Sequence, residues 1–505
     1  MHPASLLVWL AGPMPGPGYP VAPVPAGHPR VYVRPADLPA LRAKLAGTEF
    51  RKEWEQLRQS RQPLCKAFVY LVTGDGEAGR AAIAEGFRAL KENPDGRPFY
   101  NPMHFGACIY DWCYDLLTPE EKSAFVREFQ RFAGTHSPGY PPNPNRVNPV
   151  VGHDCEGWIL TNQLPAGVAI YDEAPEMYQA AARVFFDRFV EPRNFHYPSH
   201  MHHQGTHYNG ERFIHDQAAS WLFRKLGAGD VLSREQQFVP YHLLYMLRPD
   251  GKFLKSGDDN DDGGQSFNKR LAARLTGAYY RDPYLLTFSD RPQFAAPDYT
   301  AVFDLLFLDA GARRAPLSDL PLVHWFGSPM GEIVARTGWE MGTESRDALV
   351  QMRIGEYYFG NHQHRDFGTF QVYYRGPLAI DTGIYQGQEI ESSDYGSAHW
   401  SQYYTQTVAH NGLMIFDPAT AQQDYGGQRS MPSDHPRSVQ QLKEGGYRWA
   451  EVTAHGYGPD PRKPAYAFVA GDITNAYLPT KAARVARAMA MLYTGSSRYP
   501  CVLAV

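Results

Sequence analysis

Residues 356–383 read EYYFGNHQHRDFGTFQVYYRGPLAIDTG, and this stretch indicates two β-strands joined by a short turn. Side chains alternate between the two faces of a strand, so residues two apart point the same way. We therefore expect His362 and His364 to project from one face of the first strand. Asp381 ends the next apolar run, LAID, which can pair alongside the first strand.

A third imidazole, His410, lies in the segment AHNGLMIF further along the chain. Two imidazoles and a carboxylate on adjacent strands, together with this third imidazole, form a candidate zinc site. The spacing fits none of the short zinc motifs. Surface histidines on a polar strand are therefore the alternative interpretation.

The composition is that of a globular protein with two or three domains. The chain has 505 residues, of which 43% are hydrophobic and 20% charged. A net charge of −4 provides no global basic field, so nucleic acid is not an expected partner. Five scattered cysteines form no disulfide framework. No apolar run is long enough to predict a membrane span, and oligomeric state is not predicted.

The chain divides into three parts. Residues 1–29 contain a short apolar stretch and a Pro/Gly run, which indicate either a degenerate signal peptide or a disordered start. The first alternative predicts a periplasmic or secreted protein. Residues 30–320 have helical spacing, including the capping box from Thr118 to Glu121. Residues 325–505 contain short strands between Gly-rich turns, which predict an antiparallel sandwich. Because the last residues form an apolar strand, we expect a fragment that ends inside this β-domain.

Two motifs of other protein classes also occur. Residues 74–79 spell GxGxxG, but helical neighbours on both sides favour an interhelical turn over a dinucleotide site. Residues 258–263 begin like a calcium loop, yet Lys269 stands where the bidentate Glu is required. A solvated acidic turn is therefore expected there, with a looser calcium site as the alternative.

Several segments together resemble the heparinase II/III-like polysaccharide lyases, closest in motif pattern to the heparinase II type. They are RVYVRPADLPALRAKL, HHQGTHY, LRPDGKFLKSGDD, NHQHRDFGTFQVYYRGPLAIDTG and AHNGLMIFD. The resemblance implies an α+β multidomain fold, in which an incomplete (α/α) toroid precedes an antiparallel β-sandwich. It also implies cleavage of an acidic, uronate-containing polysaccharide, such as heparin, heparan sulfate, a related glycosaminoglycan or alginate.

The resemblance assigns roles to particular residues. A structural zinc ion is expected on His364, Asp381 and His410, and His362 is the catalytic histidine of the strand. The remaining roles fall on the helical domain: His203 as the catalytic loop histidine, Tyr245 as the catalytic tyrosine, and His202, Gln204 and Arg248 as substrate-binding residues. His202 is the alternative register for the loop histidine, and Tyr241 and Tyr208 compete with Tyr245.

β-Elimination requires these residue types. Donors must stabilise the charge that develops on the uronate carboxyl. A general base must remove the α-proton, and a general acid must protonate the leaving oxygen. The alternatives are a glycoside hydrolase, which needs two opposed carboxylates from candidates such as Asp258, Asp259 and Glu211, and a binding protein without catalysis.

Overall fold

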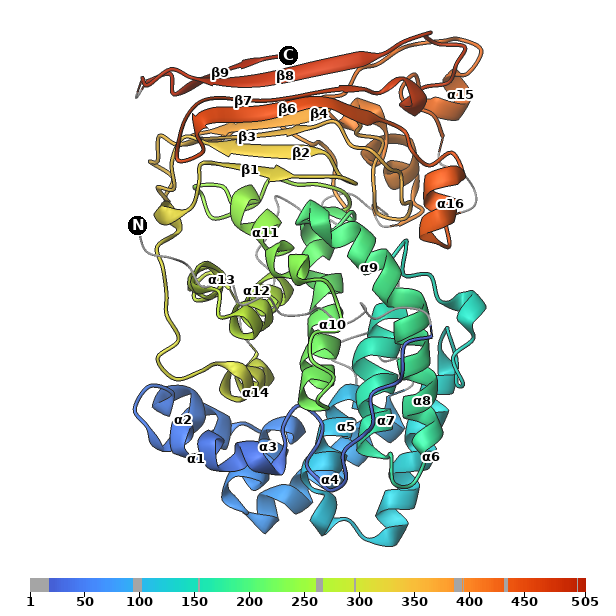
Figure 1. Cartoon of the computed structure of the whole chain (residues 1–505), viewed down its shortest axis with the longest axis vertical. Coiled ribbons are helices and arrows are strands. Elements are labelled where there is room, and N and C mark those ends of the chain that lie inside the picture. The colour runs from blue at the N-terminus through green and yellow to red at the C-terminus, as the bar shows by residue number, and fades with distance from the viewer. Residues whose placement is uncertain are drawn as a thin grey trace.

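The computed structural model describes residues 18–93, 102–152, 155–259, 267–294, 297–385, 393, 395–430, 435–496 and 498–505. Helices form the N-terminal part of the chain, and two antiparallel sheets form the C-terminal part (Figure 1). Most of the leader, residues 1–17, lies outside the described residues, so its prediction is not tested. Within the described residues, no helix combines the length and apolar character needed to cross a membrane.

The helical domain contains fourteen α-helices within the described residues. They are α1 (Leu38–Ala46), α2 (Arg51–Gln59), α3 (Pro63–Thr73), α4 (Gly76–Glu92), α5 (Pro102–Trp112), α6 (Pro119–Thr135), α7 (Leu164–Ala169), α8 (Pro175–Val184), α9 (Val190–His196), α10 (Gly205–Lys225), α11 (Tyr241–Met246), α12 (Phe267–Tyr280), α13 (Pro283–Ser289) and α14 (Asp298–Phe307). Neighbours along the chain pack together, as in the pairs α3–α4, α7–α8 and α12–α13.

Local sequence signals set several helix ends. Thr118 accepts a hydrogen bond from the backbone of Glu121, whose side chain bonds back to Thr118, so the expected capping box is confirmed. Gly74 ends α3 in the left-handed conformation, and Asp75 caps α4. The GxGxxG motif is therefore an interhelical turn, as its helical neighbours predicted.

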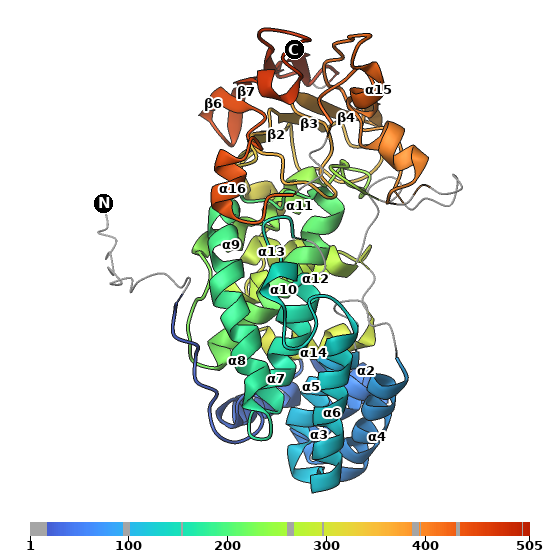
Figure 2. The same cartoon turned by 90° about the vertical axis from the view of Figure 1, so that its right-hand side faces the viewer.

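The β-domain consists of two antiparallel sheets whose strands follow chain order. The first contains β1 (Val323–Phe326), β2 (Glu332–Arg336), β3 (Ala348–Arg353), β4 (Thr369–Tyr374) and β5 (Pro377–Ala379). The second contains β6 (Glu451–Asp460), β7 (Lys463–Asp472), β8 (Ala486–Tyr493) and β9 (Cys501–Ala504). Two short helices, α15 (Ala421–Asp424) and α16 (Val439–Glu444), lie between the sheets in sequence, and α16 packs against α9 (Figure 2).

The five-stranded sheet is the middle layer of the molecule (Figure 1). Every residue of β3 is buried, because both faces of this strand are covered. Val350 and Met352 belong to the core shared with the second sheet, whereas Leu349 belongs to the core shared with α11 and α13. The expected antiparallel sandwich is therefore present, and its inner sheet also seals the helical domain.

Candidate active site

His362 and His364 lie on a loop between β3 and β4, so their predicted position on a strand is wrong. Gly360 and Asn361 both adopt positive φ angles, of 92° and 55°. This left-handed turn breaks the alternation of an extended chain, and Gly and Asn are the residues that tolerate it best. The two imidazoles nevertheless meet, because both turn towards one carboxylate, that of Asp258.

Asp258 is the centre of the site. Its Oδ2 lies 2.6 Å from Nδ1 of His362, and its Oδ1 lies 2.8 Å from Nε2 of His364. The indole Nε1 of Trp400 donates to both oxygens at 2.9 Å. Burial raises the pKa of Asp258, although hydrogen bonds from His362 and Trp400 act against this rise. The prediction of a solvated acidic turn is therefore wrong at Asp258 and at buried Asp259, while residues 260–263 lie outside the described residues.

Two glycines allow the loops of the site to approach one another. A Cβ on Gly205 would lie 1.5 Å from the carbonyl oxygen of Ser256, and a Cβ on Gly257 would lie 2.8 Å from that of His362. Both glycines have positive φ angles, of 85° and 64°. The backbone of Asp258 can then donate to the carbonyl of His362 at 3.1 Å. Only glycine fits such a crossing, which accounts for the glycines of HHQGTHY and KSGDD.

The loop of Asp258 is also attached to the inner sheet by a row of buried side chains. Nε2 of Gln371 donates to the carbonyl of Lys255 at 2.6 Å and to Oε1 of Gln351. Gln351 in turn donates to Glu332, which lies 3.0 Å from Nε2 of His242 on α11. The row therefore connects three strands, α11 and the loop that presents Asp258.

Among the described residues three tyrosines have ring contacts with His362, namely Tyr208, Tyr385 and Tyr395, and Tyr208 has the shortest. Its ring stacks on the imidazole with a centroid distance of 3.8 Å and an interplanar angle of 19°. The guanidinium of Arg212, one turn later on α10, lies 4.8 Å from the centre of the Tyr208 ring. The Tyr208 hydroxyl donates to the hydroxyl of Tyr385 at 3.3 Å. Burial raises the pKa of Tyr208 far above its usual value, so the hydroxyl stays protonated.

Tyr245, the favoured tyrosine on sequence grounds, lies in the core between α11 and the inner sheet. It is fully buried, its hydroxyl donates to the carbonyl of Pro321 at 2.9 Å, and its ring packs against His324 and Trp339. Tyr241 donates to Asp282. Tyr245 therefore shares none of the contacts described for His362, and its catalytic role stays a prediction.

Arg248 is likewise separate from the His362 group in its described contacts. Its guanidinium pairs with Asp250 in the turn that follows α11 and lies 5.1 Å from the centre of the Tyr373 ring. The cation described over the Tyr208 ring is instead Arg212, which the sequence places four residues after Tyr208. This helical spacing was the available signal for Arg212.

The loop histidines form a buried cluster beside the site. His203 stacks between His202 and Phe359, at 4.6 and 4.5 Å, and its Nε2 lies 2.8 Å from the carbonyl of Val151. Burial lowers the pKa of both histidines well below the usual value, so both are neutral. Gln204 donates to Val151 and accepts a hydrogen bond from Arg212 at 3.4 Å, which links this loop to Tyr208.

The three residues expected to hold zinc are neighbours. Nδ1 of His410 lies 3.1 Å from Oδ1 of Asp381, and the rings of His364 and His410 are 5.1 Å apart. Nδ1 of His364 and Nε2 of His410 are buried and have no hydrogen-bond partner within the described part of the chain. Burial and the neighbouring His410 lower the pKa of His364 to about 3, so this ring is neutral, as a metal ligand must be.

These nitrogen and oxygen donors fit zinc in kind. Across the described ranges, however, no three His, Cys, Asp or Glu side chains are already arranged as a metal site. Zinc binding by His364, Asp381 and His410 therefore stays a prediction.

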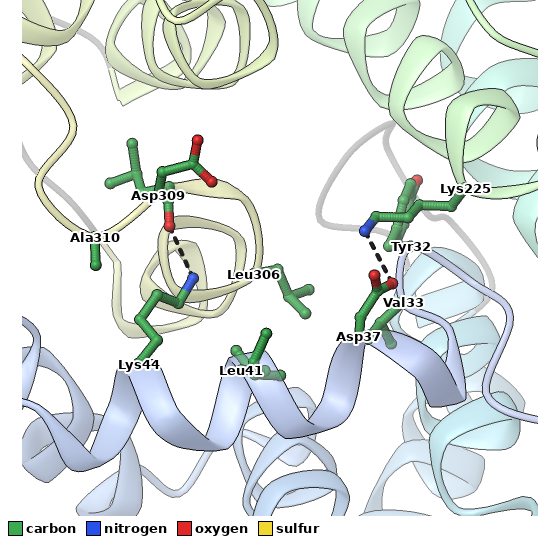
Figure 3. A pocket seen from close by; sticks show the side chains of 11 residues that line it. Tyr32, Val33, Asp37, Leu41, Lys44, Lys225, Leu306, Asp309 and Ala310 are labelled. Atoms are coloured by element: carbon green, nitrogen blue, oxygen red, sulfur yellow. Dashed lines mark hydrogen bonds and ion pairs between the residues drawn. The ribbon is translucent and has the colours of Figure 1, made fainter.

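A cavity of about 310 Å³ lies elsewhere, between α1, the end of α10 and the residues after α14 (Figure 3). Its two lysines are engaged within the protein: Lys44 donates to the carbonyl of Leu308, and Lys225 pairs with Asp37. None of the predicted site residues lines this cavity.

The fold and site together define an α+β protein with a polar site between its helical domain and its β-domain. Residues 333–466 match the family model of the heparinase II/III-like C-terminal domain. This part of the chain is therefore heparinase II/III-like, which confirms the resemblance seen in the sequence. No curated protein matches the chain.

Solved structures of heparinase III are similar to the chain at low identity. A crystal structure of heparinase III is 14% identical, has a TM-score of 0.48, and is matched over 87% of this chain and 61% of its own length. A heparinase III gene product is 12% identical, has a TM-score of 0.45, and is matched over 96% of this chain and 71% of its own length. The chain thus spans less than two thirds of the first of these structures.

Proposed function

We propose that the protein is a polysaccharide lyase that cleaves a uronate-containing polysaccharide by β-elimination. The observation that carries the proposal is the stack of Tyr208 on His362, with the cationic Arg212 on the same tyrosine. A base, an acid and a cation are the three groups that β-elimination at a uronate needs. The heparinase II/III-like character of residues 333–466, which include His362, supports the same reaction class.

In this proposal the two proton transfers are carried out by different side chains. His362 directs Nδ1 towards Asp258, so in the neutral ring Nε2 carries the lone pair and takes the proton from C5 of the uronate. The electron pair of the broken C–H bond forms the C4–C5 double bond as the C4–O bond breaks. Tyr208, kept protonated by burial, donates its proton to the leaving oxygen. Arg212 neutralises the charge on the carboxyl, a role for which an electrostatic donor contributes about 2.7–4 kcal/mol.

Several finer assignments belong to the same proposal. The substrate is heparin, heparan sulfate or a related glycosaminoglycan, with alginate or another polyuronate as the alternative. The helical domain forms the incomplete (α/α) toroid of this lyase class, and the protein acts in the periplasm or outside the cell. Zinc, held by His364, Asp381 and His410, would cross-link the loops that follow β3, β5 and the 407–409 turn.

The test is incubation with heparin, heparan sulfate, chondroitin sulfate and alginate, followed by ultraviolet absorbance of the unsaturated uronate product. We expect the chromophore with one of these substrates and its loss in the His362→Ala variant. New reducing ends without the chromophore would refute elimination and favour hydrolysis. The carboxylates available for hydrolysis are engaged in the structure: Asp258 with two histidines, Asp259 with Thr206, and Glu211 with His207.

A further inference from the structure

We infer that Asp258 is a positioning residue that fixes the tautomers of His362 and His364 in opposite senses with one carboxylate. The inference deepens the proposed lyase function and rests on it for the role of His362. It concerns a group that the sequence assigned to a solvated turn, although its side chain is completely buried.

An ionised carboxylate only accepts hydrogen bonds, so each ring nitrogen that faces it must carry a hydrogen. Nδ1 of His362 and Nε2 of His364 face the two oxygens of Asp258, at 2.6 and 2.8 Å. In the neutral rings the lone pairs therefore lie on Nε2 of His362 and on Nδ1 of His364. The single carboxylate of Asp258 thus leaves His362 able to act as a base through Nε2 and His364 able to bind a metal through Nδ1.

The assignment for His364 agrees with its surroundings. Nδ1 of His364 is the ring nitrogen for which the described residues offer no hydrogen-bond partner, and His410 is a neighbour of this ring. A histidine that binds metal commonly donates its other N–H to a carboxylate, which sets the ring orientation. Asp258 therefore occupies the place of such an outer carboxylate for His364, and at the same time it orients the catalytic His362.

The carboxylate is held rigidly enough for this role. Trp400 donates to both oxygens, and the backbone N–H of Asp258 donates to the carbonyl of His362. Gly257 permits this backbone approach. Because His362, His364 and Trp400 all donate to the carboxylate, its plane is fixed. Asp258 therefore cannot rotate towards one histidine without losing its hydrogen bond to the other.

The Asp258→Asn variant tests the inference. An amide of the same shape offers one accepting oxygen and one donating NH₂, so it can keep only one of the two imidazole N–H bonds. The other ring must turn its lone pair towards residue 258 and change tautomer. We expect ¹⁵N NMR of labelled histidines to show this change for His362 or His364. When the ring that changes is His362, we also expect kcat to fall about 10²–10⁴-fold with little change in KM, because Asp258 orients a catalytic group without binding substrate.

Two further variants separate positioning from general stability. Asp259→Asn changes the adjacent buried carboxylate, which accepts from Thr206 at 2.7 Å, and we expect it to keep both tautomers and kcat. Trp400→Phe removes one donor but keeps the carboxylate, and we expect unchanged tautomers with a smaller fall in kcat. Circular dichroism establishes that each variant is folded.

Unchanged histidine tautomers in folded Asp258→Asn protein would overturn the inference, as would an equal loss of kcat in Asp259→Asn. The NMR measurement needs no substrate. A protein whose tautomers switch in Asp258→Asn, but which forms no unsaturated product from any polysaccharide, would therefore refute the proposed function and support the positioning role of Asp258.

Discussion

Replacing Tyr208 and Tyr245 separately by Phe gives the sharpest test of the site, because the two tyrosines have opposite expected phenotypes. Each change removes one hydroxyl and leaves the ring. Tyr208 stacks on His362, whereas Tyr245 belongs to the core between α11 and the inner sheet. We therefore expect Tyr208→Phe to lose activity and Tyr245→Phe to lose stability.

The magnitudes follow from the hydrogen bonds of the two hydroxyls. Tyr208 donates to the hydroxyl of Tyr385 at 3.3 Å, a long hydrogen bond whose loss costs about 0.5–1.5 kcal/mol. Loss of a general acid lowers kcat about 10²–10⁴-fold. Tyr245 donates to the partly buried carbonyl of Pro321, and Tyr245→Phe removes this bond at a cost of about 0.5–1.5 kcal/mol.

The assays are formation of the unsaturated uronate product and unfolding in urea, measured on both variants and the wild-type protein. Tyr241→Phe is a matched control, because its hydroxyl is bonded to Asp282 in the same region as Tyr245. We expect Tyr241→Phe to retain kcat. An active Tyr208→Phe enzyme together with an inactive, fully stable Tyr245→Phe enzyme would show that the assignment of the catalytic tyrosine is wrong.

Three other changes test separate features. His364→Ala is expected to abolish zinc binding, measured by elemental analysis after dialysis, and to destabilise the β-domain; wild-type protein without zinc would contradict the metal site. Burial and the charge of Arg193 lower the pKa of His196 to about 3, so between pH 6.5 and 3 the unfolded state binds one more proton at this residue than the folded state. The free energy of unfolding therefore decreases as the pH is lowered through this range, by up to about 1.4 kcal/mol per pH unit for this group. We expect His196→Leu to show a shallower decrease in unfolding titrations, and an equal slope would refute this. Gly205→Ala should unfold the site loop, because its Cβ would overlap Ser256, whereas Gly74→Ala, with open space around it, should cost only about 1–2 kcal/mol in urea unfolding.

The sequence allowed the order of helices and strands to be predicted, because these depend on local patterns. The capping box at Thr118 and the Gly74 turn are examples in which a few adjacent residues carry the whole signal. Strand β3 was recognisable from a short apolar run, since both of its faces are covered. The same local reasoning failed at His362, where the positive φ angles of Gly360 and Asn361 override the apparent alternation.

The site was less predictable, because its residues are brought together by contacts distant in sequence. The neighbours His364, Asp381 and His410 were named, yet Asp258 and Trp400 were missed. The segment KSGDD is strongly polar, and a run of acidic residues ordinarily lies in solvent. Its burial depends on donors more than a hundred positions away, which no local pattern contains.

The choice among the tyrosines also depends on contacts that are distant in sequence. Tyr245 lies in the apolar helix YHLLYM, a pattern typical of core residues, and the family resemblance outweighed that pattern. Tyr208 lies in HYNGERF, where an arginine one helical turn later and the polar residues around the tyrosine were the signs of a polar site. Under the proposed function, the local polarity around Tyr208 is the signal that distinguishes it from Tyr245.

The site and the junction of the two domains form one structural unit. Gln371 on β4 holds the loop of Asp258 through the carbonyl of Lys255, and the same row continues through Gln351 to Glu332 beneath α11. A buried polar network is stable only when all its members are bonded, so displacement of the sheet from the helices would leave several groups unpaired at once. This cost keeps Tyr208, from the helical domain, against His362, from the β-domain. The placement of Tyr208 against His362, the two side chains proposed to react, is thus a consequence of how the domains dock.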